Sequence, residues 1–323
     1  EVPGLDAGWF EACVFGPAPD WPPADRRDLR EVEASALAGF DAVIHLAALS
    51  NDPLGNLDRE LTLDINHRAS VRLARAAREA GVERFLFASS CSLYGVQGDG
   101  LLDESATFHP ITAYGESKVL VERDLGAMAD DRFSPVFLRN ATAYGVSPRL
   151  RMDIVVNNLV GWALTTGDVL IQSDGTPWRP LVPVEDFCRA FLAVLEAPRE
   201  RVHARAFNVG RTSENYRVQD LADMVQAAVP GSRVRYVEGG GPDPRSYRVS
   251  CAKLEETLPE YRPEWTVERG VRELVDAFAH EGLGPADFPG ERYVRLERIR
   301  ALRDAGLIDD GLRWLAGARE AAR

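Results

Sequence analysis

Cysteine, long apolar runs and leader-like segments are scarce or absent in this chain of 323 residues. Its four cysteines are widely spaced and form no C-x-x-C pair, so both a zinc site and a disulfide framework are disfavoured, and we expect no metal. Reduced thiols of this kind are typical of a cytoplasmic protein. No apolar run approaches the ~20 residues that span a bilayer, and no stretch resembles a signal peptide, so we expect no membrane association.

The chain also has fewer positively charged than negatively charged residues. Lysine and arginine together number 38 against 50 aspartates and glutamates, which gives a formal net charge of −12 and a pI of about 5.0. An acidic surface disfavours binding to nucleic acid and to anionic lipid. A phosphate-bearing ligand would therefore need a locally basic pocket. With 45% hydrophobic and 27% charged residues, the composition is otherwise that of a globular protein with a large core.

Apolar runs and helical periodicity alternate along the sequence. The run at 40–48 has the length and composition of a strand buried on both faces. Strands separated by helices of about 10–15 residues predict βαβ units and a parallel sheet, that is, an α/β fold of the doubly wound Rossmann type. Further strands are expected at 83–90, from 134 and at 205–210, and helices at 68–82, 113–129, 153–167, 184–198 and 218–231.

Glycine is lacking where a dinucleotide-binding sheet would carry it. Asp6 ends "GLD" after an apparent strand, where an acid can bind the ribose hydroxyls of a dinucleotide; a capping or loop role is the simpler alternative. Asp25, which precedes the run at 40–48, has the same two interpretations. Only five residues precede Asp6, so this sequence has no room for a glycine-rich motif before it. Either the fold differs, or a first strand and its glycine loop lie upstream. We expect the second, with about 25–35 upstream residues forming one βα unit at the sheet centre.

Two short stretches carry the chemistry. "ASSCSLYG" (88–95) contains Ser90, and "AYGESK" (113–118) contains Tyr114 and Lys118. With "FDAVIHLAA", "DGTPWRPLVPVED" and "FNVG" in this order, they resemble the extended short-chain dehydrogenase/reductase family, the NAD-dependent nucleotide-sugar epimerases and dehydratases. The alternative is a surface Tyr–Lys pair and a strand-end Ser, which the order and spacing of the surrounding motifs disfavour.

Tyr114 would need a nearby cation to act as a base, because the pKa of tyrosine is near 10. Lys118 lies one helical turn later on the same face, and a fixed charge a few Å away is worth a few kcal/mol, which would bring the pKa of Tyr114 toward the working range. The resemblance implies that Lys118 also holds the nicotinamide ribose and that Ser90 shares the hydrogen bond to the reacting oxygen. It implies NAD contacts at Asp6, Asp25, Ala47, Ala48, Asn66, Tyr114 and Lys118.

The two residues after Ser90 bear on the type of reaction. The 4,6-dehydratases that the chain resembles carry Asp and Glu there, whereas this chain has Cys91 and Ser92. Neither forms an acid/base pair for eliminating water, so dehydration is disfavoured and the 4-epimerases are the better match. Epimerisation needs no further base when hydride leaves and returns on opposite faces of a rotated keto-sugar. Asp6 favours NAD, because it would repel a 2′-phosphate.

The resemblance also extends to a nucleotide-sugar substrate. Arg179 in "DGTPWRPL" matches a residue that binds the diphosphate, a role suited to a guanidinium. The substrate Asn of the family is Thr142 here, and the spacing around Arg245 differs, which suggests a sugar or nucleotide unlike UDP-galactose. The implied substrate contacts are Ser92, Thr142, Asn158, Arg179, Asp243 and Arg245.

Three regions are expected: an NAD-binding Rossmann domain over 1–145, a substrate lobe over 146–282 interleaved with the last sheet elements, and a C-terminal helical extension over 283–323. The favoured function is an NAD-dependent nucleotide-sugar epimerase. A keto-sugar reductase or dehydrogenase comes second, and a non-catalytic NAD-binding protein third. The resemblance implies a homodimer formed through the helices at 68–80 and 113–129.

Overall fold

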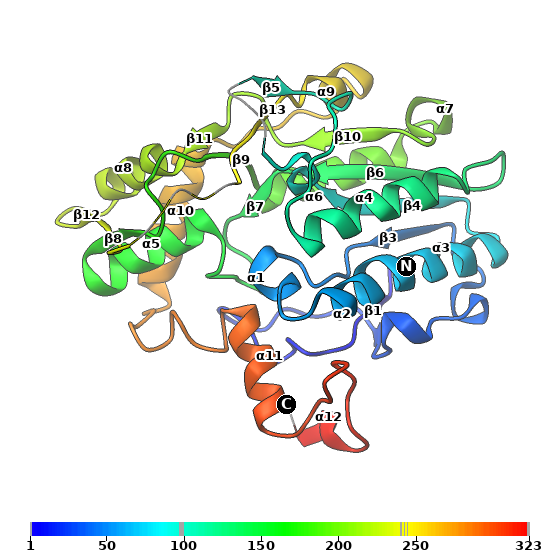
Figure 1. The fold of residues 1–323 in the computed structure, drawn as a ribbon, viewed down its shortest axis with the longest axis horizontal. Coiled ribbons are helices and arrows are strands. Elements are labelled where there is room, and N and C mark those ends of the chain that lie inside the picture. The colour runs from blue at the N-terminus through cyan, green and yellow to red at the C-terminus, as the bar shows by residue number, and fades with distance from the viewer. Residues whose placement is uncertain (1, 97–99, 240, 242, 244, 322–323) are drawn as a thin grey trace.

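A parallel sheet of four strands, in the order β10-β6-β4-β3, forms the centre of one lobe (Figure 1). Every neighbouring pair in this sheet runs parallel, as the alternation of strands and helices predicts. The strands are β3 (Ala42–His45), β4 (Arg84–Ser90), β6 (Ser134–Asn140) and β10 (Ala206–Val209). The computed structural model describes residues 2–96, 100–239, 241, 243 and 245–321.

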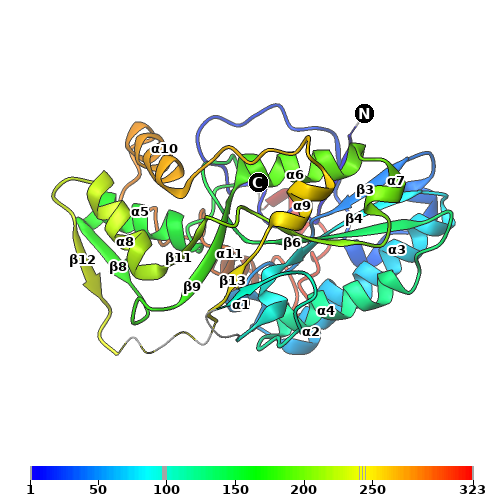
Figure 2. The same cartoon turned by 90° about the horizontal axis from the view of Figure 1, so that it is seen from above.

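Helices cover both faces of this sheet (Figure 2). Side chains alternate along β4, so that Phe85 and Phe87 pack with α3 and α4, whereas Leu86 packs with α6. Both faces are therefore apolar, and the site at the end of β4 is held between two packed layers. The helices are α3 (Ala69–Glu79), α4 (Ala113–Gly126) and α6 (Val184–Glu196).

A second lobe is built on smaller sheets (Figure 2). Strand β9 lies between β7, which is parallel to it, and β11, which is antiparallel; β8 and β12 form a separate parallel pair. Helices α5, α8 and α10 share one apolar cluster with these strands. The bounds are β7 (Thr142–Tyr144), α5 (Val155–Thr166), β8 (Asp168–Ile171), β9 (Trp178–Pro183), β11 (Asn215–Arg217), α8 (Val218–Ala228), β12 (Arg233–Tyr236) and α10 (Val267–His280).

Short elements connect the two lobes and flank them. Within the described part of the chain, no helix is long and apolar enough to cross a membrane. The strands are β1 (Gly4–Leu5), β2 (Ala24–Asp25), β5 (Leu101–Leu102) and β13 (Arg248–Val249). The α-helices are α1 (Asp52–Gly55), α2 (Arg59–Leu63), α7 (Arg199–Val202), α9 (Ala252–Thr257), α11 (Arg295–Asp304) and α12 (Ala318–Ala321). The 3₁₀ helices are η1 (Leu29–Glu31), η2 (Ala34–Leu37) and η4 (Cys91–Tyr94), and η3 (Asp64–Arg68) is π-helical.

Strand β3 lies at the edge of the four-stranded sheet, so the prediction that 40–48 is buried on both faces is wrong. Ile44 is 37% exposed and Leu46 is 53% exposed. Among the described residues β3 pairs only with β4, while β1 and β2 form a separate two-stranded parallel sheet. An apolar run in the sequence predicts a strand, but it does not tell whether both edges of that strand are paired.

The C-terminal extension packs against the loop that follows β3. Ile299 and Leu302 of α11 share an apolar cluster with Leu49 and Leu54, which flank the start of α1. The indole nitrogen of Trp314 donates a hydrogen bond to the carbonyl of Ala7 at 2.6 Å. Figure 1 shows α11 and α12 together below α2 and β1. The extension therefore joins the N-terminal segment to a loop beside the site.

Candidate active site

The carboxyl end of β4 places Ser90 at the edge where parallel α/β sheets bind ligands. Ser90 has an extended backbone and caps η4, because its Oγ accepts a hydrogen bond from the Ser92 amide at 3.2 Å. The Ser92 hydroxyl also donates to Ser90 Oγ at 2.9 Å. Ser90 lies opposite Asn140, the last residue of β6. Two strand ends therefore frame the hydroxyl of Ser90.

Helix α4 brings Tyr114 and Lys118 to the same edge. Thr112 caps this helix, because its Oγ1 accepts a hydrogen bond from the Gly115 amide at 3.1 Å, and the helix begins at the next residue. Tyr114 therefore lies in the first turn, where its hydroxyl is hydrogen-bonded to Ser90. Lys118 follows one turn later on the same face. The three residues singled out from the sequence are thus brought together.

The ammonium of Lys118 is buried beside aromatic rings. Its Nζ donates a hydrogen bond to the carbonyl of Ala88 at 2.7 Å and lies 4.6 Å from the ring centroid of Phe87 and 5.4 Å from that of Tyr114. Burial lowers the pKa of Lys118 to about 7, and the negative charge of Glu122 opposes this shift. The charge of Lys118 is therefore sensitive to its neighbours near neutral pH.

The electrostatics of Tyr114 differ from the expectation. Burial, the largest influence, raises the pKa of Tyr114 above its ordinary value, and the negative charge of Asp52 acts in the same direction. The hydrogen bond with Ser90 and the positive charge of Arg151 lower it. Lys118 does not produce the predicted lowering here, because its own pKa of about 7 leaves the amine largely neutral where a tyrosine ionises.

Arg151 is held rigidly between the two lobes. Its Nε and Nη2 donate to the two carboxylate oxygens of Asp153 at 2.8 and 3.0 Å. Its Nη1 donates to the hydroxyl and the carbonyl of Ser50 at 3.1 and 3.2 Å. The amide of Asn51 donates to Asp153 at 2.8 Å. The loop after β3 is thereby tied to the residues that follow β7, with a fixed cation near Tyr114.

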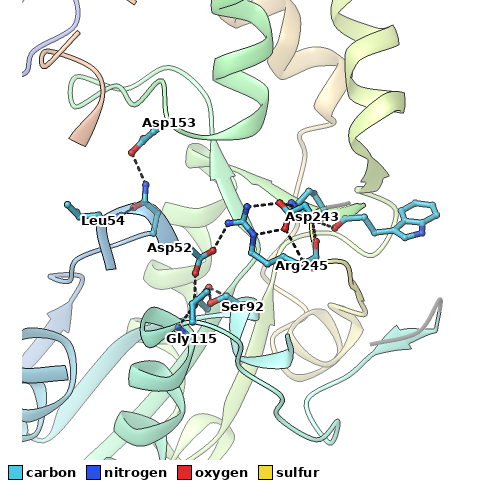
Figure 3. Close-up of polar contacts among 12 residues, drawn as sticks. Asp52, Leu54, Ser92, Gly115, Asp153, Asp243 and Arg245 are labelled. Carbon is cyan, nitrogen blue, oxygen red and sulfur yellow. Dashed lines mark hydrogen bonds and ion pairs between the residues drawn. The ribbon is translucent and has the colours of Figure 1, made fainter. Parts of the chain in front are cut away.

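Figure 3 shows Asp52 between Arg245 and the start of α4. Asp52 Oδ1 accepts a hydrogen bond from Thr112 Oγ1 at 2.6 Å, and its Oδ2 lies 2.6 Å from Arg245 Nη1. Asp243 in turn bridges two arginines, since its Oδ2 lies 2.5 Å from Arg245 Nη2 and 2.6 Å from Arg179 Nη2. Two guanidinium groups therefore converge with two carboxylates beside the start of α4.

The other expected substrate contacts are spread around this edge. Thr142 is the first residue of β7 and follows the end of β6 after one residue. Asn158 lies on α5, and its amide donates to the carbonyl of Met152 at 2.9 Å. Ser92 is held against Ser90 as described above.

The expected cofactor residues fall into two groups. Asp6 and Asp25 are exposed at the ends of the paired strands β1 and β2, where Asp6 Oδ1 accepts from the Gly8 amide at 2.6 Å and Asp25 is 3.0 Å from Arg27. The other predicted cofactor residues lie near the end of β3 and on α4.

In that second group, Asn66 is buried and clamps the loop after β3. Its Oδ1 accepts from the Leu49 amide at 2.7 Å, and its Nδ2 donates to the Leu49 carbonyl at 3.2 Å. Ala47 is exposed and Ala48 half-buried in the same loop. Two small side chains thus leave the backbone accessible just beyond the end of β3. No cluster of three or more His, Cys, Asp or Glu side chains that could hold a metal ion occurs in the part of the chain that the structure describes.

Residues 21–210 match the NAD dependent epimerase/dehydratase family. The chain belongs to this family. It is 30% identical over 275 residues to UDP-glucose 4-epimerase of Mus musculus, a match that covers 77% of this chain and 76% of that protein. It is 32% identical over 168 residues to the uncharacterized UDP-glucose epimerase YtcB of Bacillus subtilis (strain 168), covering 51% of this chain and about half, 52%, of that protein. A solved structure of MoeE5 in complex with UDP-glucuronic acid and NAD has a TM-score of 0.75 at 26% identity, covering 87% of this chain and 91% of that chain.

Membership of the NAD dependent epimerase/dehydratase family confirms the expected α/β Rossmann class and NAD as the cofactor. The residues present fit that cofactor. Asp6 ends a strand and leaves its carboxylate exposed, and Lys118 offers a buried ammonium beside Tyr114. Asp6 suits the ribose hydroxyls of the adenosine, and Lys118 suits those of the nicotinamide riboside.

Asp52, Arg151 and Glu122 are the residues at this site that sequence reasoning missed. Asp52 follows Ser50 and Asn51, whose position after a predicted strand was the available signal. Glu122 is one turn beyond Lys118, a spacing that places both on one face of the predicted helix. Arg151 left no signal, because nothing in its local sequence shows that it reaches the loop after β3.

Proposed function

We propose that the chain is an NAD-dependent epimerase of a nucleotide-diphosphate sugar that acts through a transient keto-sugar. The observation that carries the proposal is the convergence of Ser90, Tyr114 and Lys118 at the carboxyl edge of β4, with neutral side chains at Cys91 and Ser92. When bound, NAD accepts a hydride from the sugar and returns it. The proton transfer and the orientation of the sugar are carried out by side chains of this protein.

Tyr114 acts as the base that takes the proton of the sugar hydroxyl and later returns it. Ser90, which is already bonded to the Tyr114 hydroxyl, orients the reacting oxygen. The positive charge of Arg151 favours the tyrosinate in a site whose burial disfavours it. A proton held at the Tyr114 oxygen is thus available again when hydride returns to the opposite face of the ring.

Elimination of water has little support from the residues after Ser90. The Cys91 thiol is buried, donates to the Arg139 carbonyl at 3.1 Å, and has a pKa well above its ordinary value because of burial. The Ser92 hydroxyl donates to Ser90. Neither offers an acid or a base of suitable pKa. The second candidate function is therefore reduction or oxidation of a nucleotide keto-sugar with the same three residues.

Arg179 and Arg245 are the proposed ligands of the substrate diphosphate, with Asn158 nearby on α5. Their side chains lie beside Asp243 and Asp52, so a diphosphate would compete with those carboxylates for the guanidinium groups. We also expect a cytoplasmic homodimer formed through α3 and α4.

The test is to incubate the protein with catalytic NAD and a panel of UDP-, dTDP-, GDP-, CDP- and ADP-sugars and to identify products by proton NMR. A new sugar isomer with no net change in NADH supports the epimerase. A keto-sugar or a deoxy-sugar, or a product that requires stoichiometric NAD or NADH, overturns it in favour of a dehydratase, dehydrogenase or reductase.

A further inference from the structure

Three successive residues at the end of β4 each bond to a different position on α4. The pairs are Ala88 with Lys118, Ser89 with Glu122, and Ser90 with Tyr114. The Ser89 hydroxyl donates to Glu122 Oε1 at 2.6 Å. Two of these pairs contain the proposed catalytic groups, and the pair of Ser89 with Glu122 adds a third contact, one turn beyond Lys118, that helps to set the register of α4 against β4.

Glu122 also forms a buried ion pair with Arg139 of β6. Arg139 Nε lies 3.0 and 3.1 Å from the two carboxylate oxygens, and its Nη2 lies 2.7 Å from Oε2. The side chains of Arg139 and Glu122 are only 6% and 7% exposed. Arg139 stands directly opposite Ser89 in the sheet, so one carboxylate on α4 binds neighbouring residues of two strands. Its Nη1 continues to the Tyr94 hydroxyl at 3.1 Å.

Burying a charged pair is costly, and a buried ion pair is weak evidence for a contribution to stability alone. This pair stands one helical turn beyond Lys118, on the same face of α4. Among the described residues, three titratable groups act on Lys118 or lie beside it: Tyr114 and Glu122 on α4, and His45 on β3. Arg139 on β6 binds Glu122. Burial lowers the pKa of His45 to about 3, so that ring is neutral at working pH. Glu122 is thus the anion of this set that opposes the effect of burial on the lysine.

We propose that Glu122 is a positioning residue that fixes the register of α4 on β4 and favours the protonated form of Lys118, and that Arg139 holds Glu122 in place. Glu122 touches neither substrate nor cofactor in this role. The effect of Glu122 on catalysis, through the positive charge of Lys118 beside Tyr114, rests on the proposed function. The charge state of Lys118 does not, and it can be measured without any substrate.

The sequence makes that measurement direct, because Lys118 and Lys253 are its only two lysines. Protein labelled with ¹³C-lysine gives two Cε signals, and Lys253→Arg assigns them. In Glu122→Gln the titration midpoint of Lys118 should fall by about 1 or more, the size of effect that a nearby opposite charge produces. Glu122→Asp, which keeps the charge, should retain most of the wild-type midpoint. An unchanged midpoint in Glu122→Gln overturns the proposal.

Arg139→Gln is the second variant, needed because Glu122→Gln leaves a buried guanidinium without its carboxylate. It should shift the Lys118 midpoint, because Glu122 is then no longer held by the guanidinium; an unchanged midpoint contradicts the role of Arg139 in holding Glu122. In an active protein, Glu122→Gln should lower kcat more than it raises KM, and activity should recover toward lower pH. If wild-type protein shows no turnover with any nucleotide sugar, the proposed function fails, while the lysine titration still decides the role of Glu122.

Discussion

Asp52 and Arg245 are separated by 193 residues in the sequence, yet Asp52 Oδ2 and Arg245 Nη1 lie 2.6 Å apart. The same carboxylate accepts a hydrogen bond from Thr112, the residue that caps α4. One side chain at the start of α1 therefore contacts both the residue that caps α4 and Arg245 (Figure 3).

Replacing Asp52 by Asn should strengthen the binding of a nucleoside diphosphate. Arg245 would then pair with Asp243 but not with Asp52. This ion pair is partly exposed, and loss of such a pair is worth about 1 kcal/mol, or roughly fivefold in affinity. Titration calorimetry with UDP measures the change. Asp310→Asn removes the same charge from an exposed position, where the carboxylate pairs with Arg303. Equal tightening in both variants, or weaker binding in Asp52→Asn, contradicts the prediction.

Tyr114→Phe should lose turnover by a factor of about 10²–10⁴, the usual contribution of a positioned general base. The fold should survive, because the hydroxyl bonds to Ser90 at the edge of the sheet and not within either apolar layer. Product formation and NAD affinity are measured side by side. Tyr236→Phe, on the exposed strand β12, is the control and should keep full activity. Retained turnover in Tyr114→Phe would remove this tyrosine from the mechanism.

His45 should make the protein sensitive to acid. Ser70 Oγ donates its proton to the Asn66 carbonyl at 2.6 Å, so the neutral His45 ring must donate from Nε2 to Ser70 Oγ across 2.7 Å. Burial first, and then the charge of Lys118, lower the pKa of His45 from 6.5 to about 3. Between these values the unfolded chain binds a proton that the folded protein does not, so the free energy of unfolding falls as the pH falls.

Urea unfolding at several pH values between 6.5 and 4 tests this. Each pH unit should cost up to about 1.4 kcal/mol through His45, and His45→Gln should flatten the dependence. His280→Gln, at an exposed position at the end of α10, should leave the wild-type slope unchanged. A slope that is the same in wild type and His45→Gln would contradict the assignment.

Gly95→Ala should destabilise the turn that follows Ser90. Gly95 has φ 65° and ψ −130°, and an added Cβ would meet the carbonyl oxygen of His109 at 1.6 Å. A strained backbone of this kind costs about 1–3 kcal/mol before the clash is counted, and relief of the clash would shift η4. The free energy of unfolding and turnover should both fall. Gly100→Ala, where an added Cβ meets no atom within 4 Å, should change neither.

The sequence predicts the parts of the site that lie within one element or one motif. Tyr114 and Lys118 share a helical face because of their spacing, and Ser90 ends an apolar strand, so their roles could be inferred together. Asp52 and Arg245 could not be paired in advance, because their contact depends on how the two lobes close. The pKa of Tyr114 is raised and not lowered as predicted, because its burial and the nearby charge of Asp52 are properties of the packed site. The prediction that 40–48 is buried on both faces is wrong at Ile44, because the order of the strands in the sheet decides whether this residue is covered.

The hydrogen bond from Trp314 to Ala7 joins positions 307 residues apart. Contacts of such sequence separation form late, because the chain between them must be ordered first. At a synthesis rate of ~5–20 residues per second, the segment around Ala7 would wait about 15–60 s on the ribosome before its partner exists. The segment around Ala7 is therefore made well before Trp314, and this contact can form only after the intervening residues have been synthesised.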